Sequence, residues 1–322
     1  MVDKRKIVYY RLGCVFGVGI FLLAVCTICF ANSNGQTQNV DSNETLPYEK
    51  KQQPIIIWFH NGVTDKPEAL KIALSSGLVN HVIVKYMHPA DRDWRKKKNV
   101  LEAIEIVKRS RAKLIWCRNA WPYENVQDAR LSDFFDANYY IRQITNLRAE
   151  AAEMGADYVA LDMEAYAYAP VGRYLKGKDR IFLSKAQWRQ LEEAIDTAIE
   201  KAGKVDFIFP GGSVDETKPN GVLARLGKMR IAEETYWSNE ERQKRITFPY
   251  EIFGAYLNTV REDKNHPGSW HFLVPEIFEK SELWSKKEGL FLYPKERRAM
   301  EVARELLAYS RTLPVADPNT NK

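Results

Sequence analysis

From Pro54 onward, short apolar runs alternate with longer stretches in which apolar residues recur every three or four positions. The short runs are typical of buried strands, and the longer periodic stretches are typical of amphipathic helices. Their alternation predicts repeated β/α units around a parallel sheet. The predicted strands number eight and span residues 55–61, 81–88, 112–121, 158–164, 205–211, 230–237, 270–277 and 289–294.

Helical patterns lie between these predicted strands. The clear ones span 66–76, 99–110, 132–154, 185–203 and 295–312, and weaker ones span 220–228, 249–257 and 279–287. Ser132 and Ser184 stand where amino-terminal helix caps are expected, and Gly155 and Gly203 stand where carboxyl-terminal caps are expected. Eight strands over about 250 residues predict a (β/α)8 TIM barrel, residues 54–314, as a single α/β domain.

A doubly wound open sheet is the main alternative fold. That fold usually carries a glycine-rich phosphate turn after its first strand. Here the first predicted strand is followed by Asn61-Gly62, which lacks that pattern. The barrel is therefore the favoured fold.

The amino-terminal part differs in composition from the predicted barrel. Basic residues precede an uncharged apolar stretch, residues 12–31, which is about the ~20 residues a helix needs to cross a bilayer. We expect residues 1–31 to be a membrane anchor, or a signal peptide if cleaved, with the barrel outside the cytoplasm. Residues 32–53 are polar and predict a flexible linker, and residues 315–322 predict a disordered tail.

Charge and composition exclude several other functions. The net charge is a modest +6, and the densest basic run, 92–98, is typical of a solvated loop. Since no aromatic-plus-basic pattern accompanies it, we expect no nucleic-acid partner. The histidines are scattered without metal-ligand spacing, so no metal, and no cofactor, is predicted. Cys117 is the single cysteine of the predicted barrel, so it forms no internal disulfide, and no obligate protein partner is inferred.

The segment DYVALDMEAYAYAP, residues 157–170, places two carboxylates at the end of the fourth predicted strand. Every other residue from Val159 to Met163 is apolar, so this side of the strand should meet the helices. Asp162 and Glu164 then point into the barrel near its carboxyl end, where barrel enzymes carry their chemistry. We therefore predict that both acids face one cavity, with Asp162 supporting Glu164.

Glu276 is the third candidate acid. It lies near the end of the predicted strand 270–277, which would face strand four across the barrel. Two carboxylates roughly 5–5.5 Å apart catalyse glycoside hydrolysis, one as acid and base and the other as nucleophile. Glu164 is the predicted acid and Glu276 the predicted nucleophile; alternatively, an N-acetyl amide of the substrate replaces Glu276 while Asp162 orients it.

The D-x-E sequence at 162–164 resembles the end of strand four in chitinase-like family 18 and lysozyme-like family 25 of the glycoside hydrolases. In family 18 a D-G-x-x-D-x-D-x-E run ends in the proton donor, so the resemblance implies that Glu164 is the donor and Asp162 its partner. Asp157 matches the start of that run, whereas Tyr158 replaces its glycine and Ala160 one of its acids. The resemblance is therefore to TIM-barrel glycoside hydrolases and not to one family.

Aromatic and polar residues near the predicted strand ends are candidates for binding a sugar. Flat aromatic faces stack on pyranose rings, while amides and acids bind hydroxyl groups. The predicted substrate-binding residues are Asn61, Asn119, Trp121, Tyr166, Glu234, Tyr236, Trp237 and Tyr293.

The sequence thus predicts an exported, membrane-tethered glycoside hydrolase that acts on a poly- or oligosaccharide. A non-catalytic barrel that binds glycans or an envelope partner is the alternative. Another barrel enzyme, such as a lyase or aldolase, would use Lys85 on the second strand. Lys85 shares its strand phase with Ile83 and Met87, which argues against an inward position.

Overall fold

The computed structural model describes residues 53–59, 67–86, 98–119, 135–163, 183–210, 219–232, 250–261, 271–279, 282, 284–294 and 298–314. The predicted membrane segment, the linker up to residue 52 and the tail from residue 315 lie outside these residues. None of the helices in the described ranges is both long and apolar enough to span a bilayer.

In the described part of the chain, eight parallel strands form one sheet. Its order is β6-β5-β4-β3-β2-β1-β8-β7, so strands that follow one another in the sequence are paired, except β6 and β7, and β1 is paired with β8. The strands are β1 Ile55–Ile57, β2 His81–Tyr86, β3 Lys113–Asn119, β4 Tyr158–Asp162, β5 Val205–Phe209, β6 Gly227–Arg230, β7 Ile252–Leu257 and β8 Gly289–Pro294.

The sheet curls into a nearly closed barrel. Its two outer strands, β6 and β7, meet in the described structure through a parallel bridge between Ile231 and Ile252. The backbone N–H of Ala232 donates to the carbonyl of Ile252 at 3.1 Å there. With helices outside the strands, this architecture is consistent with a TIM barrel, as the alternation of patterns predicted.

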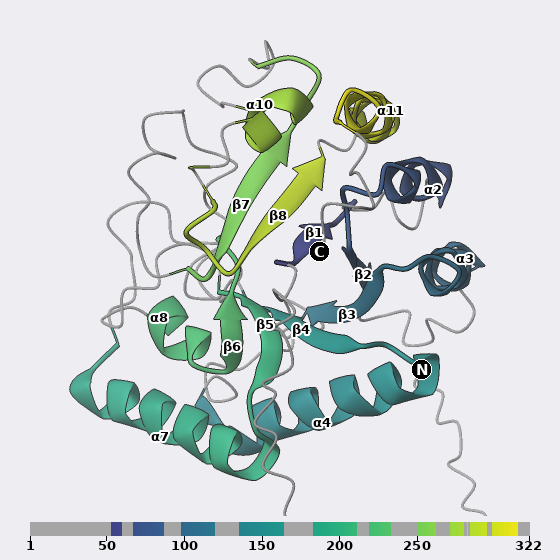
Figure 1. The fold of residues 1–322 in the computed structure, drawn as a ribbon. Helices are drawn as coiled ribbons and strands as arrows, with labels where there is room; N and C mark the ends of the chain where they lie inside the picture. The colour runs from purple at the N-terminus through teal and green to yellow at the C-terminus, as the bar shows by residue number, and fades with distance from the viewer. Residues whose placement is uncertain are drawn as a thin grey trace, which may run out of the picture. The chain divides into compact units, whose positions relative to one another are not determined.

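Helices cover the outside of the barrel, and α4 and α7 pack side by side (Figure 1). The described helices are α2 Pro67–Ser75, α3 Lys98–Lys108, α4 Ala137–Met154, α7 Lys185–Ala202, α8 Pro219–Ala224, α10 Val274–Glu279 and α11 Ala299–Ser310. As predicted, Ser184 caps α7, where it forms a capping box with Gln187. Helix α4 begins later than predicted and is capped by Asp136; the predicted cap Ser132 lies outside the described residues.

Two apolar clusters follow the alternation of side chains along the strands. Val159, Leu161 and Met163 belong to the outer cluster, between sheet and helices. Ala160 belongs to the inner cluster, inside the barrel, together with Ile83. The predicted phase of the fourth strand is therefore confirmed, because its branched residues meet the helical layer.

The prediction for the seventh strand is wrong. Residues 252–257, expected within a helix, form β7 and pair with β8 over their full length. In the predicted strand 270–277, the described residues 271–273 instead lead into α10, which begins at Val274. Pro275 fits the first helical turn, where the missing N–H leaves no hydrogen bond unmade.

The boundaries of the sixth strand also differ from the prediction. β6 ends at Arg230, so the predicted strand 230–237 overlaps it only at that residue. The short helix α8 ends at Ala224, earlier than the predicted helix 220–228, because β6 already begins at Gly227. The weak helix predicted at 279–287 is not found among the described residues of that stretch.

Candidate active site at the carboxyl end of the barrel

Strand β4 carries Asp162 into the barrel interior at its carboxyl end. Asp162 is the last residue of β4 and is only 2% exposed. It lies level with Asn119, the last residue of β3, and with Phe209, the last residue of β5. Asp162 therefore has the inward position that the phase of the strand predicts.

Lys85 of β2 forms an ion pair with Asp162 inside the barrel. The two side chains are 3% and 4% exposed, and the ammonium donates to Oδ2 of the carboxylate. On its other side the Lys85 Nζ lies 4.5 Å from the centroid of the Trp58 ring, in a cation–π contact. The argument against an inward Lys85 is therefore wrong: Lys85 shares its phase with Ile83, and Ile83 lies in the inner cluster.

The second carboxylate oxygen of Asp162 differs from the first. Oδ1 is buried and has no hydrogen-bond partner among the residues that the structure describes. A buried carboxylate oxygen without a donor is costly, because it has given up its hydrogen bonds to water. Oδ1 can therefore accept a hydrogen bond from a donor that is not among the described residues.

Aromatic rings build the wall of the barrel interior beside this ion pair. Trp58, which directly follows β1, contacts Phe209 at 5.6 Å and Tyr293 at 5.1 Å between ring centroids. Tyr293 stacks in turn on Tyr256 of β7 at 5.3 Å. Tyr293, predicted to bind substrate, is 7% exposed and forms part of this wall.

Glu276 lies beyond the carboxyl end of β7, on α10 and not on a strand as predicted. It is 6% exposed and forms an ion pair with Arg261 at 3.2 Å. Its Oε2 also accepts from the backbone N–H of Leu273 at 3.5 Å. Because Leu273 directly precedes α10 and Glu276 is the third helical residue, this contact is the acid half of a capping box.

A second polar group lies beside the aromatic wall. His271 is fully buried, contacts the Tyr256 ring edge-on at 4.6 Å, and lies within 3.4 Å of the Asn258 amide. The backbone of this segment is fixed to β7, since the N–H of Phe272 donates to the carbonyl of Tyr256 at 2.9 Å. The start of the segment 271–279 is therefore held beside the carboxyl end of β7.

The remaining predicted site residues lie outside the described residues. They are Asn61, Trp121, Glu164, Tyr166, Glu234, Tyr236 and Trp237. Of Asn119 the structure describes the backbone, which ends β3 level with Asp162. Thus Asp162 is the member of the predicted acidic set that the described structure places in the barrel interior.

Sequence reasoning missed the neighbours of Asp162. Trp58 and Tyr256 were not singled out, and Lys85 was set aside. The signal for Lys85 was available in strand register: Lys85 pairs with Cys117 of β3, and Cys117 with Ala160 of β4. Cys117 and Ala160 are small, and their place beside Lys85 indicates space inside the barrel for the long Lys85 side chain.

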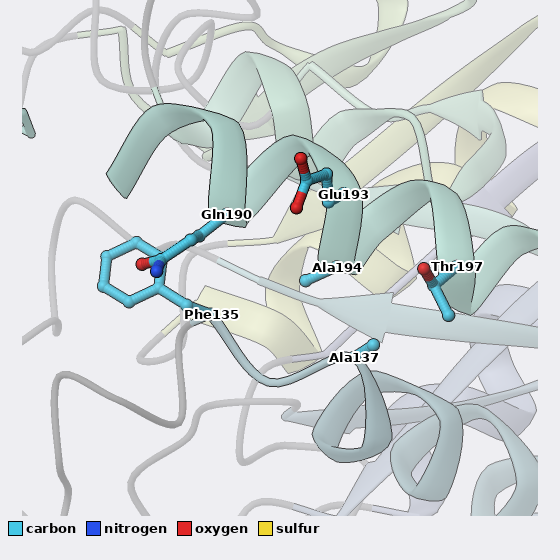
Figure 2. Close-up of a pocket in the computed structure, with 6 residues that line it drawn as sticks. All are labelled: Phe135, Ala137, Gln190, Glu193, Ala194 and Thr197. Carbon is cyan, nitrogen blue, oxygen red and sulfur yellow. The ribbon is translucent and has the colours of Figure 1, made fainter. Parts of the chain in front are cut away.

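Within the described ranges, no group of three or more His, Cys, Asp or Glu side chains could hold a metal ion. A pocket of about 440 Å³ lies away from the barrel interior, between α4 and α7, with Phe135 and Gln190 at one end and Thr197 at the other (Figure 2). Glu193 is the titratable group among the described residues of its lining. The described lining therefore offers a single group of the kind that acid–base catalysis uses.

Comparison with known proteins adds no family. No protein-family model matches the sequence, and no curated protein matches it. Solved structures matched by the chain include an endo-β-N-acetylglucosaminidase from Cordyceps militaris, with a TM-score of 0.43 at 10% identity, covering 83% of this chain and 93% of that chain.

Two other solved structures are matched as well. A structure of fungal β-1,4-galactanases has a TM-score of 0.35 at 13% identity, covering 76% of this chain and 90% of that chain. An aldo-keto reductase complexed with NADPH has a TM-score of 0.26 at 15% identity, covering 80% of this chain and 82% of that chain. Likenesses this distant carry no argument about activity, since one barrel fold hosts many chemistries.

Proposed function

We propose that the chain is a glycoside hydrolase in which Glu164 is the general acid and base and Asp162 is its partner. The observation that carries the proposal is the buried carboxylate of Asp162, directed into the barrel at the carboxyl end of β4. Glu164 follows two residues later and, in extended backbone, shares the side of Asp162. The proposal is supported by the general rule that barrel enzymes carry their chemistry at this end and that glycoside hydrolysis uses a pair of acids.

The ion pair with Lys85 decides which role suits Asp162. A lone anion would favour the protonated form of a neighbouring glutamic acid, but the Lys85 ammonium balances the charge of Asp162. The role we assign to Asp162 is therefore to accept a hydrogen bond through Oδ1. On this proposal, the raised pKa that a general acid needs has to come from a source other than the charge of Asp162.

This role fits a substrate with an N-acetyl group. The Asp162 carboxylate accepts the amide N–H, and the amide oxygen then attacks the anomeric carbon while Glu164 protonates the departing glycosidic oxygen. Glu164 next removes a proton from the water that opens the cyclic intermediate, which restores both groups. Glu276 is the alternative nucleophile, but its carboxylate is already bound to Arg261 and to the first turn of α10.

An assay of purified full chain on a panel of oligosaccharides tests the proposal. The panel contains N-acetylated and unacetylated sugars in α and β linkages. We expect hydrolysis of an N-acetylated member, and a loss of kcat of at least about 100-fold in Glu164→Gln, because general acid–base catalysis contributes about 10²–10⁴-fold. Binding without hydrolysis of any sugar, unchanged in Glu164→Gln, would instead indicate a non-catalytic glycan-binding barrel.

The variant Glu276→Gln in the same assay separates the two nucleophiles. If the substrate amide is the nucleophile, Glu276→Gln keeps kcat within about tenfold of the parent protein. If Glu276 attacks the sugar, the variant loses most activity and a covalent glycosyl-enzyme accumulates in the parent. Equal rates of hydrolysis for unacetylated and acetylated sugars would also rule out the substrate amide as the nucleophile.

We further propose that the barrel is exported and held at a membrane by residues 12–31. The proposal is supported by the uncharged apolar stretch and by the basic residues before it. Protease added to intact cells should then degrade residues 54–314. Protection of the barrel until the cells are lysed would contradict export.

A further inference from the structure

The buried ion pair between Lys85 and Asp162 is more than a packing feature. Both side chains have left water almost completely, and removing two charges from water costs about as much free energy as their attraction returns. Such a pair is weak as a source of stability. Its position at the carboxyl end of the barrel points to a role in the chemistry of Asp162.

Lys85 makes the two oxygens of Asp162 unequal. The ammonium donates to Oδ2, whereas Oδ1 has no donor among the described residues. A carboxylate with one oxygen held by a cation keeps its orientation, and its other oxygen is presented in a fixed direction. It also stays charged at lower pH than a free buried acid would, because the neighbouring positive charge favours the anion.

Lys85 is itself held on two sides. The Trp58 ring lies under its ammonium, and Trp58 is packed against Phe209 and Tyr293. Both the ring and the carboxylate favour the charged amine. A Schiff-base lysine must be neutral to attack a carbonyl, so these contacts argue against a lyase or aldolase that uses Lys85 as a nucleophile.

We propose that Lys85 is a positioning residue that keeps Asp162 ionised and turns its Oδ1 toward an N–H or O–H donor of the bound sugar. The inference rests on the proposed glycoside hydrolase function for its effect on catalysis. Its structural half, the ionised and oriented carboxylate, stands on the ion pair alone and is measured separately below.

Four variants of the full chain test this role in hydrolysis: Lys85→Met, Lys85→Arg, Asp162→Asn and Lys113→Met. We expect Lys85→Met to lower kcat about 10- to 100-fold, the range typical of groups that orient a catalytic residue, with a smaller change in KM. In Lys85→Met the acidic limb of the kcat–pH profile should move to higher pH, because Asp162 then stays protonated up to a higher pH. Lys85→Arg should restore most of the activity and return the limb toward its original position.

Lys113→Met is the matched control. Lys113 also pairs with an aspartate, Asp157, at 2.8 Å, but at the amino end of β3 and largely exposed. This variant should leave kcat and the acidic limb unchanged. Two outcomes would overturn the proposal and leave Lys85 a structural role. One is a loss of activity in Lys85→Met with an unchanged pH profile, and the other is a lack of rescue in Lys85→Arg.

Titration of the Asp162 carboxyl carbon by ¹³C NMR, assigned with Asp162→Asn, tests the structural half without a substrate. Cys117 and the tyrosines of the inner cluster stay neutral at acid pH. His271, which contacts Tyr256, and Glu164 can titrate there, and they are controlled by repeating the titration in His271→Phe and Glu164→Gln. We expect Asp162 to bind a proton at clearly higher pH in Lys85→Met than in the parent protein. Identical titrations would overturn the inference.

The two readouts distinguish the possible failures. If the parent protein hydrolyses no sugar but the carboxyl titration shifts as expected, the proposed function fails and the positioning role of Lys85 stands. If Lys85→Met does not fold, the double variant Lys85→Met/Asp162→Asn, which removes both charges, should fold again. A double variant as unstable as Lys85→Met would contradict a charge-based role.

Discussion

At the scale of single residues, the amino end of the barrel is built from side chains that accept backbone N–H groups. An amide or acid near the start of one strand accepts from the preceding strand. The pairs are Asn80 with Ile55 at 2.7 Å, Asp157 with Leu114 at 2.9 Å, Asp206 with Val159 at 3.1 Å, and Glu251 with Arg230 at 2.7 Å. These contacts satisfy N–H groups at strand ends, which is a structural role.

His81 lies within this polar end and is expected to make stability depend on pH. Burial lowers the pKa of His81 from 6.5 to about 4, Asp157 partly offsets this, and Lys113 adds to the decrease. The unfolded chain therefore binds a proton near pH 6.5 that the folded chain accepts only near pH 4. Stability from this group is complete above pH 6.5 and is lost as the pH falls toward 4.

The variant His81→Phe tests this pH dependence. Phenylalanine keeps a ring against Tyr158, on which His81 stacks at 5.5 Å, but cannot titrate. The difference in free energy of unfolding between parent and variant, measured by urea titration, should change between pH 6.5 and 4. One proton gives a slope of at most ~1.4 kcal/mol per pH unit, and we expect less because His81 is only half-buried. A constant difference would contradict the lowered pKa.

At the scale of elements, strand four could be predicted because its two sides differ in chemistry. Branched residues alternate with a small residue and two acids, so the phase is fixed by polarity. Strand two offers no such contrast: Val82, Val84 and Ile83 are apolar on both sides. In a parallel barrel both sides of a strand are buried, so the direction of Lys85 required its register with β3 and β4.

The position of the seventh strand was predicted wrongly for a related reason. IFGAYL, residues 252–257, is buried along its full length, and a short run that is buried on both sides has neither the helical nor the strand period. WHFLVPEI, residues 270–277, has the apolar run followed by an acid that strand four also has, so it was predicted to be a strand. What decides between them is pairing with β8, a long-range contact that the local sequence does not express. The fold class was therefore predictable, whereas the placement of Glu276 was not.

At the scale of the whole barrel, the two ends are divided by role. The amino end holds strand-to-strand contacts such as those of Asp157 and Glu251, and the carboxyl end holds the Lys85–Asp162 pair with an unfilled acceptor. Barrel proteins commonly separate stability and chemistry in this way. The seam between β6 and β7 is the place where the amino-end contacts matter most, since the described residues form a single backbone bridge there.

Glu251 is expected to hold that seam closed. It accepts from the Arg230 guanidinium and from the Arg230 backbone N–H next to the bridge. Burial alone would raise the pKa of Glu251, but the hydrogen bonds from Arg230 lower it below 4.5 overall. The stability it contributes is therefore present above pH 4.5 and is lost as the pH falls below that value.

Three variants test the closing role of Glu251 by urea unfolding at pH 7. Glu251→Ala removes the acceptor as well as the charge and should cost about 1–3 kcal/mol, while Glu251→Gln keeps an acceptor and should cost less. Glu105→Gln, which disrupts exposed pairs on α3, should stay within about 0.5 kcal/mol of the parent. The loss in Glu251→Gln should shrink as the pH falls below 4.5, because the parent then loses the same charge. If Glu251→Ala costs no more than Glu105→Gln, the single bridge and the packing around it are enough to close the barrel.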